Sequence, residues 1–170
     1  EFRRVLFRSP IIVGSGPAGL FAGLVLAEHG YKPLILERGW DVDKRSKIVS
    51  EFFKSGTLDE NSNIQFGEGG AGTFSDGKLT TRIKDRRINK VLTKFIEAGA
   101  PEEIAYLSKP HIGTDILRKV VKNLRNRIIE LGGEVRFSSK VNGIVIRNGS
   151  ARAVTVNEGE TIESNIIILA

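Results

Sequence analysis

The 170-residue chain contains no cysteine, and this absence excludes several kinds of chemistry. Disulfide bonds, metal sites with thiolate ligands and a redox-active pair of thiols all require cysteine. The sequence also has no apolar run of the roughly 18 residues that span a bilayer as a helix, so we expect no integral membrane protein. No signal-peptide pattern is present at the start, and the cytoplasm is therefore the expected compartment.

Charge of one sign is not concentrated along the chain. The formal net charge is +6, from 26 Lys and Arg against 20 Asp and Glu. Beyond Pro10 the basic residues are scattered, and the only cluster is Lys84, Arg86 and Arg87 around Asp85. We therefore expect no nucleic-acid partner, and a small-molecule substrate instead. With 40% hydrophobic and 27% charged residues, the composition is that of an ordinary globular domain.

The two ends of the sequence differ from the rest. Residues 1–9, EFRRVLFRS, resemble the translation of a common sequencing adapter, and we exclude them from the fold prediction, with a native basic arm as the alternative. At the other end, residues 165–170 form an apolar run rich in β-branched residues, with no turn or cap after it. We therefore expect residues 10–170 to be an incomplete domain, truncated at its C-terminus, whose last strand lies in the parallel sheet near the first strand and is buried on both faces.

The pattern of residues 10–37 predicts a strand, a glycine turn, a helix and a second parallel strand. Pro17 opens the helical pattern and Gly30 closes it. Amphipathic spacing predicts further helices, and Asn148-Gly149 predicts a hairpin turn. The expected elements after residue 37 are helices at 43–53, 88–98 and 115–131, an ordered glycine-rich loop at 61–81, and short alternating strands at 134–137, 140–147, 151–157 and 161–163. The predicted fold class is therefore α/β, a Rossmann-like parallel sheet with helices plus a small antiparallel β-meander.

Six consecutive residues between the first strand and the first helix carry the strongest functional signal. They are Gly14, Ser15, Gly16, Pro17, Ala18 and Gly19. They form Gly-x-Gly-x-x-Gly in the strand–turn–helix context that binds a dinucleotide. Gly14 permits the tight turn, Gly16 leaves room for a pyrophosphate, and Gly19 lets the helix pack closely on the sheet. The N-terminus of the helix offers N–H groups and partial positive charge to the phosphates.

Glu37 follows the second strand, where a carboxylate accepts hydrogen bonds from the adenosine ribose hydroxyls. A carboxylate there also repels a 2′-phosphate, so the site is predicted not to bind an NADP-type ligand. A nicotinamide dehydrogenase would continue directly with another strand–helix repeat. This sequence continues with a helix and a long glycine-rich loop, which favours a flavin dinucleotide over NAD.

This arrangement resembles the FAD-binding domain of the glutathione-reductase-like flavoproteins. Residues 66–82 (FGEGGAGTFSDGKLTTR) and 109–115 (KPHIGTD) are similar to segments of an uncharacterised family of FAD-dependent dehydrogenases, or FAD/NAD(P)-binding oxidoreductases. The resemblance covers residues 10–170 and implies an oxidoreductase with bound FAD, for which NAD(P)H is a candidate electron donor. Because members of that family are longer, it also implies further flavin contacts and a substrate domain after Ala170.

The resemblance implies candidate cofactor contacts outside the first turn. It places the second glycine segment beside the pyrophosphate and flavin ring, an arginine after Glu37 against the pyrophosphate, and a valine against the adenine. These residues are Gly70, Ala71, Gly72 and Thr73 for the segment, Arg45 for the pyrophosphate and Val141 for the adenine, with Arg38 added beside Glu37. Residues 66–69, directly before and at the Gly69-Gly70 pair, contain no histidine, and no Cys-x-x-x-x-Cys motif exists, so we expect non-covalent FAD without a dithiol relay.

Two alternatives remain open from the sequence. One is a non-redox FAD-binding module associated with RNA modification, and the other is an NAD-dependent dehydrogenase. The sequence identifies neither a catalytic residue nor a substrate, and it predicts no metal site.

Overall fold

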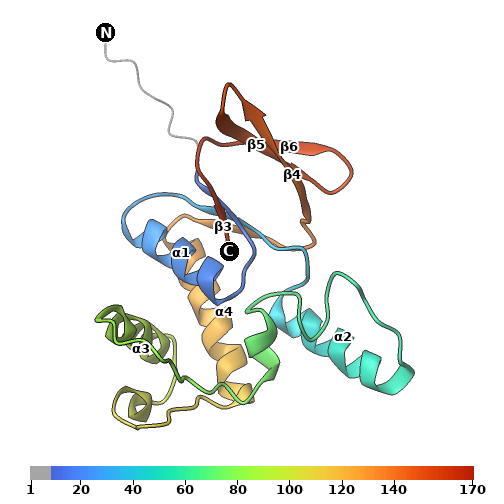
Figure 1. Cartoon of the computed structure of the whole chain (residues 1–170). Coiled ribbons are helices and arrows are strands. Elements are labelled where there is room, and N and C mark those ends of the chain that lie inside the picture. The colour runs from blue at the N-terminus through green and yellow to red at the C-terminus, as the bar shows by residue number, and fades with distance from the viewer. Residues whose placement is uncertain (1–8) are drawn as a thin grey trace.

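The computed structural model describes residues 9–170, and the adapter-like segment, apart from Ser9, lies outside the described residues. Two sheets and four α-helices make up this part of the chain (Figure 1). The strands are β1 (Ile11–Val13), β2 (Leu34–Leu36), β3 (Glu134–Arg136), β4 (Val141–Arg147), β5 (Ser150–Val156), β6 (Glu160–Glu163) and β7 (Ile167–Leu169). The helices are α1 (Pro17–Glu28), α2 (Val42–Ser55), α3 (Arg87–Glu97) and α4 (Thr114–Glu130), with short 3₁₀ turns η1 (Ala71–Phe74) and η2 (Glu102–Ala105).

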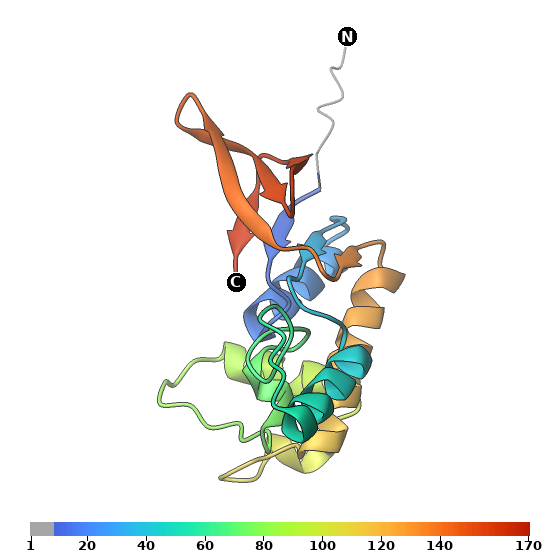
Figure 2. The same ribbon diagram turned by 90° about the vertical axis from the view of Figure 1, so that its right-hand side faces the viewer.

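A four-stranded parallel sheet in the order β3-β2-β1-β7 forms the centre of the fold. Side chains alternate across it, as they must in a strand. Ile12 and Ile35 point into a core shared with α1 and α4, whereas Ile11, Leu34 and Leu36 pack against the antiparallel β4-β5-β6 sheet. The parallel sheet is thus the middle of three layers, with helices on one side and the meander on the other (Figure 2). The predicted α/β fold with a Rossmann-like parallel sheet and a β-meander is confirmed.

The helices form where the sequence patterns predicted them. The α2 helix begins after Asp41, whose carboxylate accepts hydrogen bonds from the N–H groups of Asp43 and Lys44 at 3.0 and 3.2 Å. It ends at Gly56, which has a left-handed φ of 74°. None of the helices in the described residues is long and apolar enough to cross a membrane.

The hairpin prediction is confirmed, but two strand predictions are wrong in part. Asn148 and Gly149 have φ of 52° and 70°, as a two-residue turn between twisted strands requires. The strand after α4, β3, was expected in the meander, yet it pairs in parallel with β2, because α4 carries the chain back across the sheet. The last strand, β7, pairs with β1 as expected. It lies at the edge of the sheet, so Leu169 is 68% exposed and the strand is not buried on both faces.

Candidate functional site

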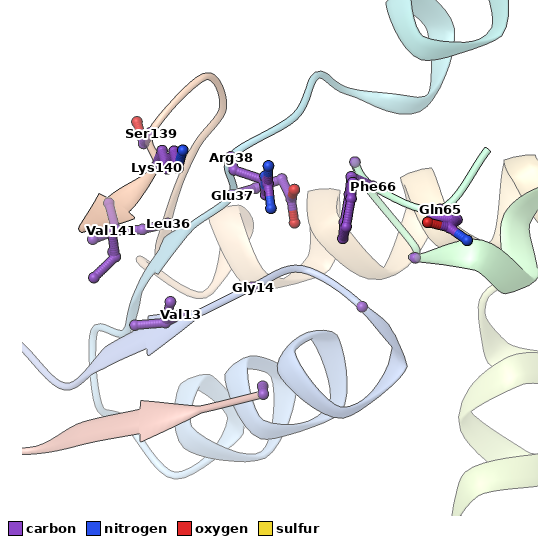
Figure 3. A pocket seen from close by; sticks show the side chains of 14 residues that line it. Val13, Gly14, Leu36, Glu37, Arg38, Gln65, Phe66, Ser139, Lys140 and Val141 are labelled. Atoms are coloured by element: carbon purple, nitrogen blue, oxygen red, sulfur yellow. The ribbon is translucent and has the colours of Figure 1, made fainter. Parts of the chain in front are cut away.

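A pocket of about 350 Å³ opens at the carboxyl ends of β1 and β2, the edge at which parallel α/β sheets bind ligands. Figure 3 shows Ser139, Lys140 and Val141 on one side, Gln65 and Phe66 on the other, and Glu37 and Arg38 between them. The full lining is Val13, Gly14, Gly16, Leu36, Glu37, Arg38, Gln65, Phe66, Gly67, Gly70, Ser139, Lys140, Val141 and Ala170.

The three glycines of the first turn differ in whether the surrounding backbone requires them. A Cβ on Gly19 would lie 2.0 Å from the carbonyl oxygen of Gly14, and Gly14 itself has a φ of +102°. The protein's own backbone therefore demands glycine at both positions. Gly16 has a φ of −65°, which any residue adopts, and no atom lies within 4 Å of the Cβ it would carry. The fold itself has no need of glycine at position 16, and the free space there faces the pocket.

Gly16 is also the N-cap of α1, and no side chain caps that end of the helix. The first turn of α1 carries no acidic side chain. The N–H groups and the positive end of the helix dipole at this end of α1 are therefore available to an anion.

Glu37 joins the first turn to the end of β2. Its Oε2 accepts hydrogen bonds from the N–H and the hydroxyl of Ser15, at 2.8 and 2.7 Å, and its Oε1 accepts one from the Gly39 N–H at 2.9 Å. The carboxylate is only 5% exposed but lines the pocket. Because a carboxylate oxygen can accept more than one hydrogen bond, Glu37 keeps capacity for a ligand hydroxyl.

Arg38, a predicted contact, and Phe66, which the sequence did not predict, form one wall of the pocket. The Arg38 guanidinium lies 4.2 Å from the centroid of the Phe66 ring, and its Nη2 donates to the Glu60 carbonyl at 3.1 Å. Arg38 had been proposed as a contact, whereas Phe66 and Gln65 had not. The only signal for Phe66 was its place at the start of the glycine-rich motif of residues 66–82.

The opposite wall comes from the segment between β3 and β4. Val141, the residue proposed to contact the adenine, lines the pocket, and Ser139 and Lys140 line it as well. The sequence missed these two residues, although both stand directly before the predicted Val141. Two polar side chains therefore border the place expected for adenine.

Arg45 does not reach the pocket, contrary to the expectation of a direct pyrophosphate contact. Its side chain is fully buried, and its guanidinium donates to backbone carbonyls of the glycine-rich loop. The accepting carbonyls are those of Asn63 and Ile64 at 2.8 Å, Glu68 at 2.7 Å, Gly70 at 2.8 Å and Gly67 at 3.3 Å. Burial lowers the pKa of Arg45 to about 10, although the Glu37 and Glu68 carboxylates oppose this shift.

The other predicted residues lie within the turn, at the surface or around a second cavity. Ser15 and Gly19 are buried within the turn, and Ala71 is exposed. Pro17, Ala18, Gly72 and Thr73 line an apolar cavity of about 500 Å³ between α1, α3, α4 and the glycine-rich loop. Since Gly16 lines the first pocket and Pro17 the second, the two adjoin at the N-terminus of α1. Among residues 9–170, no group of three or more His, Asp or Glu side chains is arranged to hold a metal ion.

The chain matches a known protein family and a longer relative. Residues 9–167 match the family model of the FAD binding domain. An "Uncharacterized protein" of Clostridium beijerinckii is 56% identical over 161 residues, which make up 95% of this chain and 30% of that protein. This chain therefore spans less than a third of the length of that relative.

Solved structures show the same fold at low sequence identity. The THI4 protein of Thermovibrio ammonificans superposes with a TM-score of 0.61 at 16% identity, over 96% of this chain and 57% of that one. The halogenase PltM, in complex with phloroglucinol and FAD, superposes with a TM-score of 0.56 at 16% identity, over 96% of this chain and 34% of that one.

Proposed function

Because this chain belongs to the FAD binding domain family, we propose that it binds FAD without a covalent bond and is the nucleotide-binding part of an oxidoreductase. When bound, FAD supplies the redox chemistry, and the chain's own residues bind and orient it. We propose a small molecule as the substrate; neither the shape nor the charge of the site identifies which one. NAD(P)H as electron donor and a cytoplasmic location are proposals supported by the sequence alone.

The observation that carries the proposal is the free space in front of Gly16, at the uncapped end of α1. A pyrophosphate placed there meets backbone N–H groups and the positive end of the helix dipole. A Cβ at this position would meet no neighbouring atom of the fold, and a bound pyrophosphate would account for the glycine.

The adenosine half of FAD fits the pocket beyond Gly16. Glu37 would accept hydrogen bonds from the ribose hydroxyls, and its negative charge would exclude a 2′-phosphate. Val141 and Lys140 would border the adenine on one side, and the Arg38–Phe66 pair on the other.

The flavin half would continue toward the segment of Gly70, Ala71, Gly72 and Thr73. The apolar cavity beside Pro17 and Gly72 adjoins the pyrophosphate position on that side. Residues 66–69 contain no histidine and the chain contains no cysteine, and both observations support non-covalent binding.

The proposal is tested by titrating the purified chain with FAD, ADP, NAD and NADP, following flavin fluorescence and calorimetric heat. We expect FAD and ADP to bind, FAD more tightly than NAD, and NADP to bind least. Acid should release any bound flavin as free FAD. Failure to take up FAD, or flavin that stays attached after denaturation, would contradict the proposal.

A further inference from the structure

We propose that Arg45, Glu68 and Arg125 form a positioning unit that holds the glycine-rich loop of residues 61–81 against the first turn. By fixing this loop, the unit sets the shape of the nucleotide pocket. This inference rests on the proposed function, because it assigns these residues to FAD affinity. None of the three lines the pocket itself.

Arg45 forms hydrogen bonds with the backbone carbonyls of a loop that has little regular secondary structure. Five carbonyl oxygens between residues 63 and 70 accept hydrogen bonds from this one guanidinium. A planar fork of N–H donors suits this arrangement, and the ammonium of lysine, with fewer donors, cannot reproduce it. Arg45 therefore determines the path of the loop from within.

Glu68 ties the same loop to two helices. Its Oε2 accepts hydrogen bonds from the Val42 N–H at the start of α2, at 2.7 Å, and from Arg125 of α4, at 3.0 Å. Its side chain is fully buried and that of Arg125 is 12% exposed. A buried carboxylate is costly without partners, so losing Arg125 would leave an uncompensated charge under the loop.

The unit is connected to the nucleotide site by a short series of contacts. The N–H of Gly69, next to Glu68, donates to the Ser15 carbonyl at 2.9 Å. Ser15 in turn donates twice to Glu37. A displaced loop would therefore disturb the Ser15–Glu37 contact, and it would move Phe66 and Gly70, which line the pocket.

Trp40 provides a signal that reports directly on this unit. It is the only tryptophan in the chain. Its backbone carbonyl accepts a hydrogen bond from the Glu68 N–H at 3.1 Å, and its backbone N–H donates to the Ser62 hydroxyl at 3.1 Å. A displaced loop should therefore move the Trp40 backbone, and tryptophan emission of the folded protein should change with it.

The experiment compares Arg45→Lys, Arg125→Met and Arg125→Lys with a matched control, Lys122→Met. Lys122 also links α4 to α2, through Asp43 at 2.6 Å, but this exposed ion pair does not touch the loop. For each variant we would measure FAD and ADP affinity, Trp40 emission and hydrogen exchange at the amides of Glu68 and Gly69.

We expect Arg45→Lys and Arg125→Met to weaken FAD and ADP binding about tenfold or more, to shift Trp40 emission and to speed exchange at both amides. Arg125→Lys should keep affinity close to that of the unaltered chain, and Lys122→Met should leave all measurements unchanged. Folded Arg45→Lys and Arg125→Met variants with normal affinity and exchange would overturn the inference, as would an equal loss in Lys122→Met.

Two other outcomes are also decisive. If Arg45→Lys fails to fold, Arg125→Met decides, because it alters the unit from α4 and leaves the bonds between Arg45 and the loop carbonyls in place. If the unaltered chain binds neither FAD nor ADP, the proposed function is wrong. Trp40 emission and exchange at Glu68 and Gly69 then decide whether the unit positions the loop.

Discussion

Replacing Gly16 with valine should remove FAD binding while leaving the fold nearly as stable as before. No atom lies within 4 Å of the new Cβ, and a φ of −65° does not strain a β-branched residue. The change at this N-cap should therefore alter the free energy of unfolding by no more than about 1 kcal/mol. For a chain of this length, that corresponds to a shift in Tm of about 2–4 °C.

The loss of binding follows from the space that the valine methyl groups take up. They would stand where we place the pyrophosphate, and would separate it from the N–H groups of α1. A hydrogen bond to a charged group contributes about 1.5–3 kcal/mol, so losing two of them costs about 3–6 kcal/mol. FAD affinity should then fall about 10²–10⁴-fold.

The matched control is Gly19→Ala. Its Cβ would lie 2.0 Å from the Gly14 carbonyl oxygen, so the backbone must move, and stability should fall by about 1–3 kcal/mol or more. Flavin fluorescence titration and thermal unfolding, followed by circular dichroism, would separate the two effects. A Gly16→Val variant that binds FAD as tightly as the unaltered chain would refute the placement of the pyrophosphate.

Three further changes test other parts of the site. Glu37→Gln should destabilise the chain by about 1–3 kcal/mol and weaken ADP binding, because the new amide N–H₂ would face the donors of Ser15 and Gly39; unchanged chemical denaturation and ADP titration would count against this. Gly72→Val, where a Cβ meets no atom within 4 Å, should reduce affinity for FAD but not for ADP, and equal effects on the two ligands in calorimetry would place the flavin elsewhere. Burial raises the pKa of Glu68 above its ordinary value of 4.5. The contribution of Glu68 to the stability of the fold is therefore greatest below pH 4.5, and it is lost as the pH rises through the pKa of the folded state. The stability advantage of the unaltered chain over Glu68→Gln should therefore shrink from pH 4 toward neutrality in urea unfolding, and a growing advantage would contradict this.

Local sequence patterns were enough to predict the first half of the site. The strand, the glycine turn, α1 and the second strand form from residues close in sequence, and their glycines and proline allow few other conformations. The pairing of β7 with β1 also followed, because an apolar β-branched strand fits a parallel sheet covered on its faces. These features depend on backbone geometry and on hydrophobic periodicity, both of which can be read from the sequence.

Only the tertiary structure determined which groups the buried charged side chains contact. Arg45 resembles a ligand-binding arginine in sequence, yet the loop carbonyls surround it, and Glu68 gave no signal among the glycines next to it. The two opposite walls of the pocket, at Phe66 and at Lys140, likewise depend on which loops meet. Turns and helices form from hydrogen bonds within a few residues, whereas the partners of Arg45 and Glu68 are 18 to 57 positions away. A buried charge is stabilised by whichever groups the fold brings to it, and contacts of that range are set by the packing of the whole chain.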